Sequence, residues 1–334
     1  MARYLSTVAL LATSLMGGAM AHPGADIQAE IAERAAWQAH PEYRSLKSCE
    51  STIKARDHKL VSARMEKFDH LREKRGLEKR TFKEVLLTNH HSNKTVTPDS
   101  TPEEIFGSDN SCILQPHVTE GPYWVSGELV REDITDDEPG VPLTFDIQLI
   151  DTTTCEPLSN VALEAWYCNS TGVYGGVSAR NNGNPNDPNA AYNTALRGIQ
   201  YSDDDGILSF DAIMPGHYTG RAVHIHIMAH IGATTLANGT IAGGTIAQVG
   251  QLFFDQSLNE EVDAIAPYST NTQAFTVNGR DGIMGQEAAT SDPVFNYVYL
   301  GDTVDEGIFG WATVGINPNV KLTARPAAHY SGPA

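Results

Sequence analysis

The sequence predicts a mainly β protein, with an antiparallel β-sandwich domain preceded by an N-terminal helical segment. Leu143, Phe145, Ile147 and Leu149 alternate with polar residues, as in a strand with one buried face. Further short apolar runs, separated by turns rich in Gly, Asn, Asp and Pro, recur at 161–167, 207–213, 222–231, 245–254 and 308–316. Upstream, residues 25–80 are rich in Ala, Glu, Lys, Arg and Leu at helical spacing, which predicts helices.

Residues 1–21 are typical of a secretory signal peptide. Arg3 supplies the positive end, Val8 to Met16 is apolar, and Ala19-Met20-Ala21 is a cleavage site with small residues at both ends. The apolar stretch is shorter than the roughly 20 residues that span a bilayer, so a membrane anchor is the weaker interpretation. We therefore predict a secreted, extracellular protein.

Residues 22–87 form the predicted helical segment, as two helices broken near Pro41, and we expect it to pack on the main domain. The dibasic pairs Lys74-Arg75 and Lys79-Arg80 raise the alternative of a cleaved propeptide. Residues 88–111 are polar and read as a linker. The sandwich domain is predicted over 112–334, and its long loop 178–193, rich in Asn, Pro and Gly, is the kind of segment that borders a functional site.

The net charge of -18 is unevenly distributed along the chain. Residues 1–94 hold 16 Lys and Arg against 11 Asp and Glu, whereas residues 95–334 hold 7 against 30. Such an acidic main domain argues against nucleic acid as a partner and favours a neutral or cationic small molecule. No segment predicts a membrane partner.

Four cysteines in a secreted chain allow two disulfides in three pairings. Of these we favour Cys49 with Cys112 and Cys155 with Cys168. Asn-X-Ser/Thr triplets, which are glycosylation acceptors in secreted proteins, begin at Asn93, Asn169 and Asn238. The sequence therefore predicts a disulfide-bonded glycoprotein.

A metal site is predicted around His224 and His226, which lie two residues apart in an apolar run. On a strand both imidazoles leave the same face, close enough to bind one ion. Tyr218 precedes them by six residues, and Tyr174 lies further upstream. Because an ordinary phenol pKa is about 10, a phenol binds a metal at neutral pH only if the ion is strongly acidic, and ferric iron meets that requirement best.

The segments Asn169-Ser-Thr-Gly-Val-Tyr174, Pro215-Gly-His-Tyr218 and Gly220-Arg-Ala-Val-His-Ile-His226 resemble the iron-binding segments of the intradiol ring-cleavage dioxygenases. This is the family of catechol 1,2-dioxygenase and protocatechuate 3,4-dioxygenase, and the likeness is greatest to its secreted fungal branch. The resemblance runs over about residues 112–255, from Glu120-Gly-Pro-Tyr123 through Gln251.

The resemblance implies an Fe(III) enzyme that cleaves a catechol-type ring with O2 to a muconate-type dicarboxylic acid. It implies equatorial ligands at Tyr174 and His224, axial ligands at Tyr218 and His226, and a hydroxide in the fifth position. Tyr218 is also the implied base, and Arg221 and Gln251 occupy positions that flank the reacting ring. The alternative roles are a surface ion pair for Arg221 and a structural strand position for Gln251.

His217 departs from the intracellular members of that family, which commonly carry other residues there. The helical segment also differs from their dimerisation helices, so the resemblance does not decide whether the protein is a homo-oligomer. The acidic domain favours catechol or hydroxyquinol over protocatechuate as the substrate. Two other functions compete: a secreted β-sandwich binding module with a structural or vestigial metal site, and a copper enzyme that binds its ion through His22, the amino-terminal residue if cleavage follows Ala21.

Overall fold

The computed structural model describes residues 46–77, 112–113, 120–288 and 291–330 of the chain. The predicted signal peptide, His22, the first predicted helix, the linker 88–111 and the Asn93 acceptor lie outside these residues. In the described part of the chain, no helix is both long and apolar enough to cross a bilayer.

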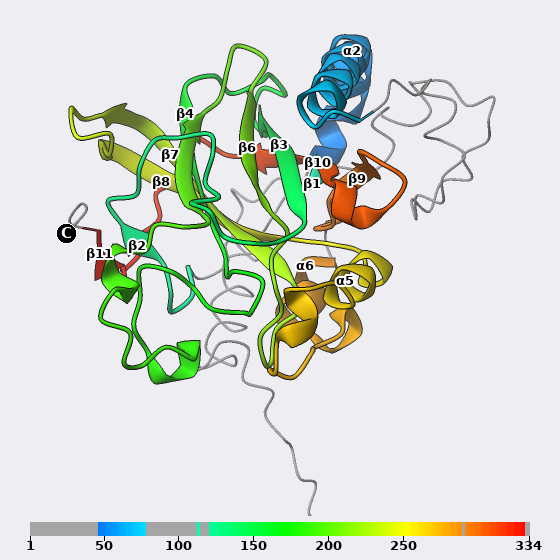
Figure 1. Ribbon diagram of the computed structural model, residues 1–334. Helices are drawn as coiled ribbons and strands as arrows, with labels where there is room; N and C mark the ends of the chain where they lie inside the picture. Colours follow the sequence, from blue (N-terminus) through cyan, green and yellow to red (C-terminus); the bar gives the residue numbers. More distant parts are fainter. Residues whose placement is uncertain (1–45, 78–111, 114–119, 289–290, 331–334) are drawn as a thin grey trace, which may run out of the picture.

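Two packed β-sheets form the body of the protein, which confirms the predicted β-sandwich (Figure 1). The first sheet has the order β1-β10-β3-β6, with β9 also paired to β10. Its strands are β1 (Cys112–Ile113), β3 (Pro142–Asp151), β6 (Ile207–Ile213), β9 (Asn296–Tyr299) and β10 (Ile308–Ile316). The second sheet has the order β5-β4-β7-β8 and contains β4 (Val161–Trp166), β5 (Arg197–Tyr201), β7 (His224–Thr235) and β8 (Ile241–Phe253).

The core lies between the two sheets because the alternating residues of each strand place one apolar row inward. On β3 the row is Leu143, Phe145, Ile147 and Leu149, all fully buried. The ring of Phe145 pairs with that of Phe210 across the antiparallel β3–β6 ladder, with centroids 5.2 Å apart. The hydrophobic alternation thus fixes which face of each strand meets the other sheet.

The prediction of an antiparallel sandwich is wrong for part of the first sheet. The central strand β10 runs parallel to both β3 and β1, although it is antiparallel to β9. Only strands joined by a tight hairpin must be antiparallel, and β10 enters the sheet after a long excursion through the second sheet. Strands β5 and β9 and helices α5 (Gln256–Asp263) and α6 (Gly282–Ala288) were also not predicted, because each is short and lacks a long apolar run.

Both faces of the second sheet are buried around the middle of β7. Ile225 and Ile227 point into the sandwich core. The opposite face carries Trp166 and Met228 and is covered by Tyr123, Trp124 and Val125. This cover includes a small parallel pair formed by β2 (Val125–Ser126) and β11 (Ala328–His329). A site on this face of β7 is therefore enclosed within the protein.

Helix α2 (Glu50–Lys74), which follows a 3-10 turn at Leu46–Cys49, packs on the first sheet, as expected for the helical segment (Figure 1). Apolar residues of α2 pack on β9, β10 and the residues next to them in one cluster, formed by Val61, Phe68, Leu71, Val298, Leu300, Phe309 and Trp311. Basic residues of the helix form ion pairs with acidic ones of the sandwich, and those among the described side chains include Arg56–Glu156, Lys59–Asp205, Lys67–Asp146 and Lys74–Asp211.

A disulfide joins Cys49, at the start of α2, to Cys155, in the turn after β3. Both favoured pairings are therefore wrong, and Cys168 is a free, buried thiol. The sequence alone does not choose between the three pairings, and the packing of Leu46 and Ile53 against Ile150 brings Cys49 next to Cys155. The bond links the helix covalently to the sandwich.

Candidate metal centre

Strand β7 presents His224 and His226 side by side on its covered face, as the two-residue spacing predicts. The Nδ1 atom of His224 lies 2.6 Å from the carbonyl oxygen of Ala222. Because a carbonyl only accepts, this Nδ1 carries the proton and the Nε2 lone pair faces the site. The ring of His226 stacks on Trp166 at 4.9 Å between centroids, and the ring of His224 contacts Phe253.

Tyr174 reaches the site from a loop, and a buried asparagine fixes its backbone. The side-chain oxygen of Asn182 accepts from the Tyr174 amide at 2.8 Å, and its nitrogen donates to the Tyr174 carbonyl at 2.8 Å. Asn182 belongs to the loop 178–193, which contains 3-10 turns but no strand. The sequence prediction that this loop borders a site is consistent with that contact, although Asn182 itself was not singled out.

Tyr218 lies on the turn that leads into β7. Its ring meets Tyr174 edge-on at 5.7 Å between centroids. Tyr123, on the covering segment, packs against the ring of Tyr174, and the centroids of the two rings are 4.8 Å apart. Tyr174 and Tyr218 therefore come from separate loops, whereas the two histidines share one strand.

The four side chains converge on one point through their polar atoms. The Oη of Tyr218 lies 3.3 Å from Nε2 of His224, which lies 3.1 Å from Nε2 of His226. That nitrogen lies 3.2 Å from Oη of Tyr174. Ligands about 2.1 Å from one ion lie about 3.0–3.4 Å apart in octahedral or tetrahedral geometry, so the four atoms fit a shared metal.

Burial sets the charge state of these groups when no ion is bound. All four side chains are at most 4% exposed. Removal from water raises the pKa of Tyr174 and of Tyr218 and lowers the pKa of His226. The imidazole is thus neutral, as a metal ligand must be, while the phenols need an acidic ion to lose their protons.

The two phenols are essential to any such site. Among the described residues, no group of three or more His, Cys, Asp or Glu side chains is arranged to hold an ion. Two imidazoles and two phenols are a donor set of hard oxygen and borderline nitrogen atoms, which suits ferric iron.

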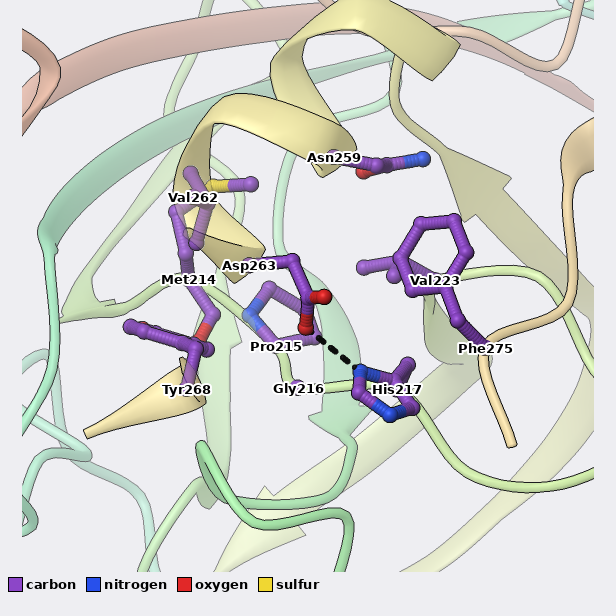
Figure 2. Close-up of a pocket in the computed structure, with 10 residues that line it drawn as sticks. All are labelled: Met214, Pro215, Gly216, His217, Val223, Asn259, Val262, Asp263, Tyr268 and Phe275. Atoms are coloured by element: carbon purple, nitrogen blue, oxygen red, sulfur yellow. Dashed lines mark hydrogen bonds and ion pairs between the residues drawn. The ribbon is translucent and has the colours of Figure 1, made fainter. Parts of the chain in front are cut away.

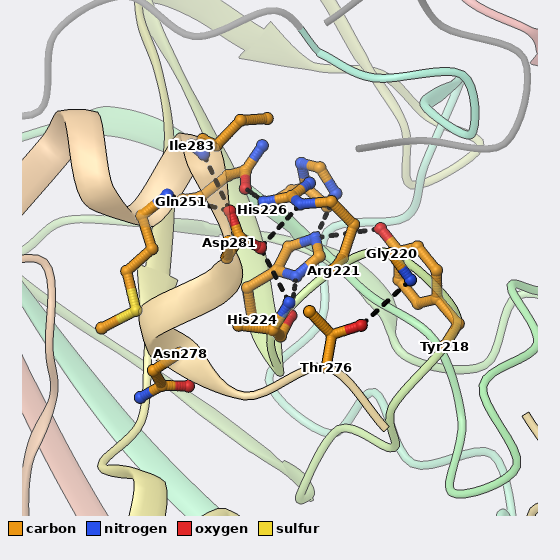
Figure 3. Close-up of polar contacts among 12 residues, drawn as sticks. Tyr218, Gly220, Arg221, His224, His226, Gln251, Thr276, Asn278, Asp281 and Ile283 are labelled. Carbon is orange, nitrogen blue, oxygen red and sulfur yellow. Dashed lines mark hydrogen bonds and ion pairs between the residues drawn. The ribbon is translucent and has the colours of Figure 1, made fainter. Parts of the chain in front are cut away.

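Arg221 lies beside Tyr218, His224 and His226 and is fully buried (Figure 3). Its Nε donates to Asp281 at 2.9 Å, and its Nη2 donates to the side-chain oxygen of Gln251. Burial alone would lower the pKa of Arg221, but the Asp281 carboxylate holds it above its usual value. The alternative of a surface ion pair for Arg221 is therefore wrong.

Gln251 reaches this position because β8 pairs with β7 in the register that sets it opposite His226. Its side chain is fully buried and contacts the guanidinium of Arg221. The structure thus brings all six sequence-predicted site residues together.

Asp281 was missed in the sequence, although it organises this side of the site. One of its oxygens accepts from the Ala222 amide at 2.7 Å as well as from Arg221. The other accepts from the amides of Ile283 and Met284, the first turn of α6. A signal was present in Asp281-Gly282, because an aspartate often caps the start of a helix.

Comparison with known proteins agrees with this geometry. Residues 117–237, which include both tyrosines and both histidines, match a protein-family model described as Dioxygenase. An intradiol ring-cleavage dioxygenase from Tetranychus urticae is similar in structure, with a TM-score of 0.52 and 27% identity over 64% of this chain and 98% of its own. A second dioxygenase structure has a TM-score of 0.51 and 27% identity over 63% of this chain and 97% of its own. The comparison with curated proteins found no match.

Proposed function

Because this chain belongs to the intradiol ring-cleavage dioxygenase family, we propose that it opens a catechol-type ring with O2 and Fe(III) to a muconate-type dicarboxylic acid. The proposal depends most on one observation: two phenol oxygens and two imidazole nitrogens meet within 3.1–3.3 Å of their neighbours in a buried site. Such a donor set matches the requirement of ferric iron for anionic oxygen ligands.

Tyr174, Tyr218, His224 and His226 would hold the ion. Bound ferric iron would supply Lewis acidity, which lowers the pKa of the coordinated hydroxyl groups and draws electron density from the ring. Tyr218 has a second role as base, in which its Oη accepts a proton from a substrate hydroxyl.

Arg221 would stabilise negative charge that develops on the ring. Its guanidinium is permanently charged, buried, and oriented by hydrogen bonds to Asp281 and Gln251. A cation fixed in advance and shielded from water stabilises such charge without reorganisation. Gln251 would orient both this guanidinium and the reacting oxygen.

The substrate and the compartment belong to the same proposal. The excess of acidic residues after residue 94 favours an uncarboxylated catechol or hydroxyquinol over protocatechuate. Secretion is supported by the signal-like residues 1–21 and by the Cys49–Cys155 disulfide, since such bonds persist in oxidising compartments.

The test combines iron content, colour and oxygen uptake. Wild type should bind about one iron per chain, absorb visible light through its tyrosinate–iron bonds, and consume O2 with catechol or hydroxyquinol. Tyr218→Phe and His224→Ala should lose most of the uptake, whereas Tyr192→Phe, a matched change at an exposed position, should not. Retained iron and uptake in His224→Ala would refute the ligand assignment. A colourless, iron-free wild type that consumes no O2 would instead favour a binding module.

A further inference from the structure

A short segment, residues 271–276, contacts both loops that carry the tyrosines. We call it the strap; the loops are residues 169–176, which carry Tyr174, and residues 215–221, which carry Tyr218. The Nε2 atom of Gln273 donates to the carbonyls of Thr171 and Gly172, each at 3.1 Å. Its Oε1 accepts from the Thr219 amide at 3.4 Å. One side chain of the strap therefore links the two loops.

His217, the neighbour of Tyr218, is held at both ring nitrogens, and Figure 2 shows the contact with Asp263. Its Nδ1 lies 2.8 Å from the Asp263 carboxylate at the end of α5, and its Nε2 lies 3.0 Å from the carbonyl oxygen of Gln273. A carbonyl only accepts, so Nε2 donates to the strap. The ring is 4% exposed and meets Phe275 edge-on at 5.2 Å.

The backbone of the second loop is also tied to the strap. Asn271 donates from its side chain to the His217 carbonyl at 2.7 Å. The Gly220 amide donates to the Thr276 hydroxyl at 3.0 Å, and the Thr219 hydroxyl accepts from the Ala274 amide at 3.1 Å. Three polar contacts outside Gln273 thus fix the residues that flank Tyr218.

The two loops also touch each other directly, at Gly172. A Cβ atom at this position would collide with the carbonyl oxygen of His217 and would lie 2.5 Å from Nε2 of Gln273. The backbone φ of +79° is itself one that residues other than glycine rarely adopt. No room is left for one loop to shift without moving the other.

We propose that the strap sets the spacing of the two phenol ligands, with Gln273 and His217 as positioning residues. A strand ladder fixes His224 and His226, but Tyr174 and Tyr218 lie on loops, which need another constraint. The inference rests on the proposed iron site, because the strap would pre-organise the phenols before the ion binds. Removing a hydrogen bond that orients a metal ligand typically lowers metal affinity by about 10–100-fold.

The test uses Gln273→Met, which keeps the length of the side chain but removes its polar atoms, with Gln200→Met on β5 as the matched control. Iron-loaded Gln273→Met should lose iron to a chelator about tenfold faster than wild type, and its tyrosinate–iron absorption should shift or weaken. The control should behave like wild type. Wild-type iron retention and absorption in Gln273→Met would overturn the inference.

A second measurement needs no metal. In metal-stripped Gln273→Met, amide hydrogen exchange should accelerate in both tyrosine loops but not in β7, whereas Gln200→Met should leave both loops unchanged. Unchanged exchange in the two loops would refute the strap even if wild type failed to bind iron. His217→Gln keeps a donor for the strap carbonyl and should retain more iron than His217→Phe. Equal iron retention in these two variants would show that His217 is not a positioning residue.

Discussion

Arg221 shows how much one buried side chain depends on its partners. Its planar guanidinium bonds two different side chains, Asp281 through Nε and Gln251 through Nη2. Lysine has a similar charge but offers a single point of attachment, so it cannot reproduce this arrangement.

We expect Arg221→Lys to lower kcat by about 10²–10³, because the cation would no longer be fixed beside the developing charge. Iron content and the visible absorption should stay close to wild type, since none of the four ligands changes. Steady-state oxygen uptake measures the effect, and Arg280→Lys, at an exposed position, is the control. A kcat within twofold of wild type in Arg221→Lys would contradict the assigned role.

The glycosylation acceptors differ in their access to an enzyme. Asn238 is exposed at the end of the β7–β8 hairpin. Asn169 is partly buried, and its side-chain oxygen accepts from the Thr171 amide and hydroxyl and from the Val173 amide. Its nitrogen donates to Glu138 at 3.2 Å.

In a secreting eukaryotic host we therefore expect a glycan on Asn238 and none on Asn169. Mass spectrometry of glycopeptides before and after treatment with an endoglycosidase would measure occupancy. Asn238→Gln should remove the mass shift of its peptide, whereas Asn169→Gln should leave the glycan content of the protein unchanged. A glycan found on Asn169 would require its loop to open before or during modification.

For single residues, sequence patterns predicted the side chains that have a recognisable local spacing. They missed the side chains whose partners are distant in the sequence. His224 and His226 could be predicted because residues two positions apart on a strand share a face. Asp281 lies sixty positions after Arg221, and Gln273 is more than a hundred positions after Thr171, so no local pattern joins either pair. Such partners become apparent only once the chain is folded.

Among the secondary-structure elements, apolar runs located the strands well. The runs at 207–213 and 308–316 coincide with the bounds of β6 and β10. The direction of β10 could not be predicted, because alternation is the same in parallel and antiparallel strands. Short polar elements such as β5 carry too few apolar residues to give a pattern.

Helix α2 is held by both apolar packing and charge, and its ion pairs differ in exposure. The side chains of Lys67 and Asp146 are 23% and 9% exposed, and Asp146 also accepts from Ser209. The side chains of Lys59 and Asp205 are 77% and 44% exposed. An exposed pair contributes little because water and salt screen it, whereas a buried carboxylate that loses its partner is destabilised.

Lys67→Met should lower the free energy of unfolding by about 1–2 kcal/mol. Lys59→Met should leave the free energy of unfolding close to that of wild type. Urea unfolding at low and high salt measures both changes, and the difference between the variants should persist at high salt. Equal losses in the two variants would mean that burial of the Lys67 pair does not matter.

The disulfide bears on whether cleavage at the dibasic pair Lys74-Arg75 could release α2 as a propeptide. It connects Cys49 to Cys155, so a cut after Arg75 would leave α2 attached to the sandwich. The apolar contacts of Phe68 and Leu71 would also remain. This architecture argues against release of α2 as a propeptide by cleavage at that pair.

For the molecule as a whole, a buried carboxyl links stability to pH. Glu128 is 1% exposed and lies 3.7 Å from Arg197, which is equally buried. Burial raises the pKa of Glu128 to about 8, although the neighbouring guanidinium partly offsets the effect. In the unfolded chain the same carboxyl has its ordinary pKa of about 4.3.

Because the folded pKa is the higher one, the folded protein keeps a proton that the unfolded chain loses. The stability from this group is complete below pH 4 and is lost as pH rises to about 8, by at most about 1.4 kcal/mol per pH unit. Glu128→Gln should flatten this decline between pH 5 and 8 in urea unfolding. Glu156→Gln, at a largely exposed position, is the control. An unchanged slope in Glu128→Gln would assign the pH dependence to other groups.

The position of β10 has a consequence for synthesis. This strand lies between β3 and β1, and β9 also pairs with it, yet it leaves the ribosome after all the other strands of the two sheets. The second sheet, with both histidines, is complete once residue 253 has emerged, whereas in the first sheet only β3 and β6 can then pair, because β1 and β9 both pair with β10. The nascent chain therefore exposes part of its inner apolar face until Ile316 emerges, and it is most prone to aggregation during that interval.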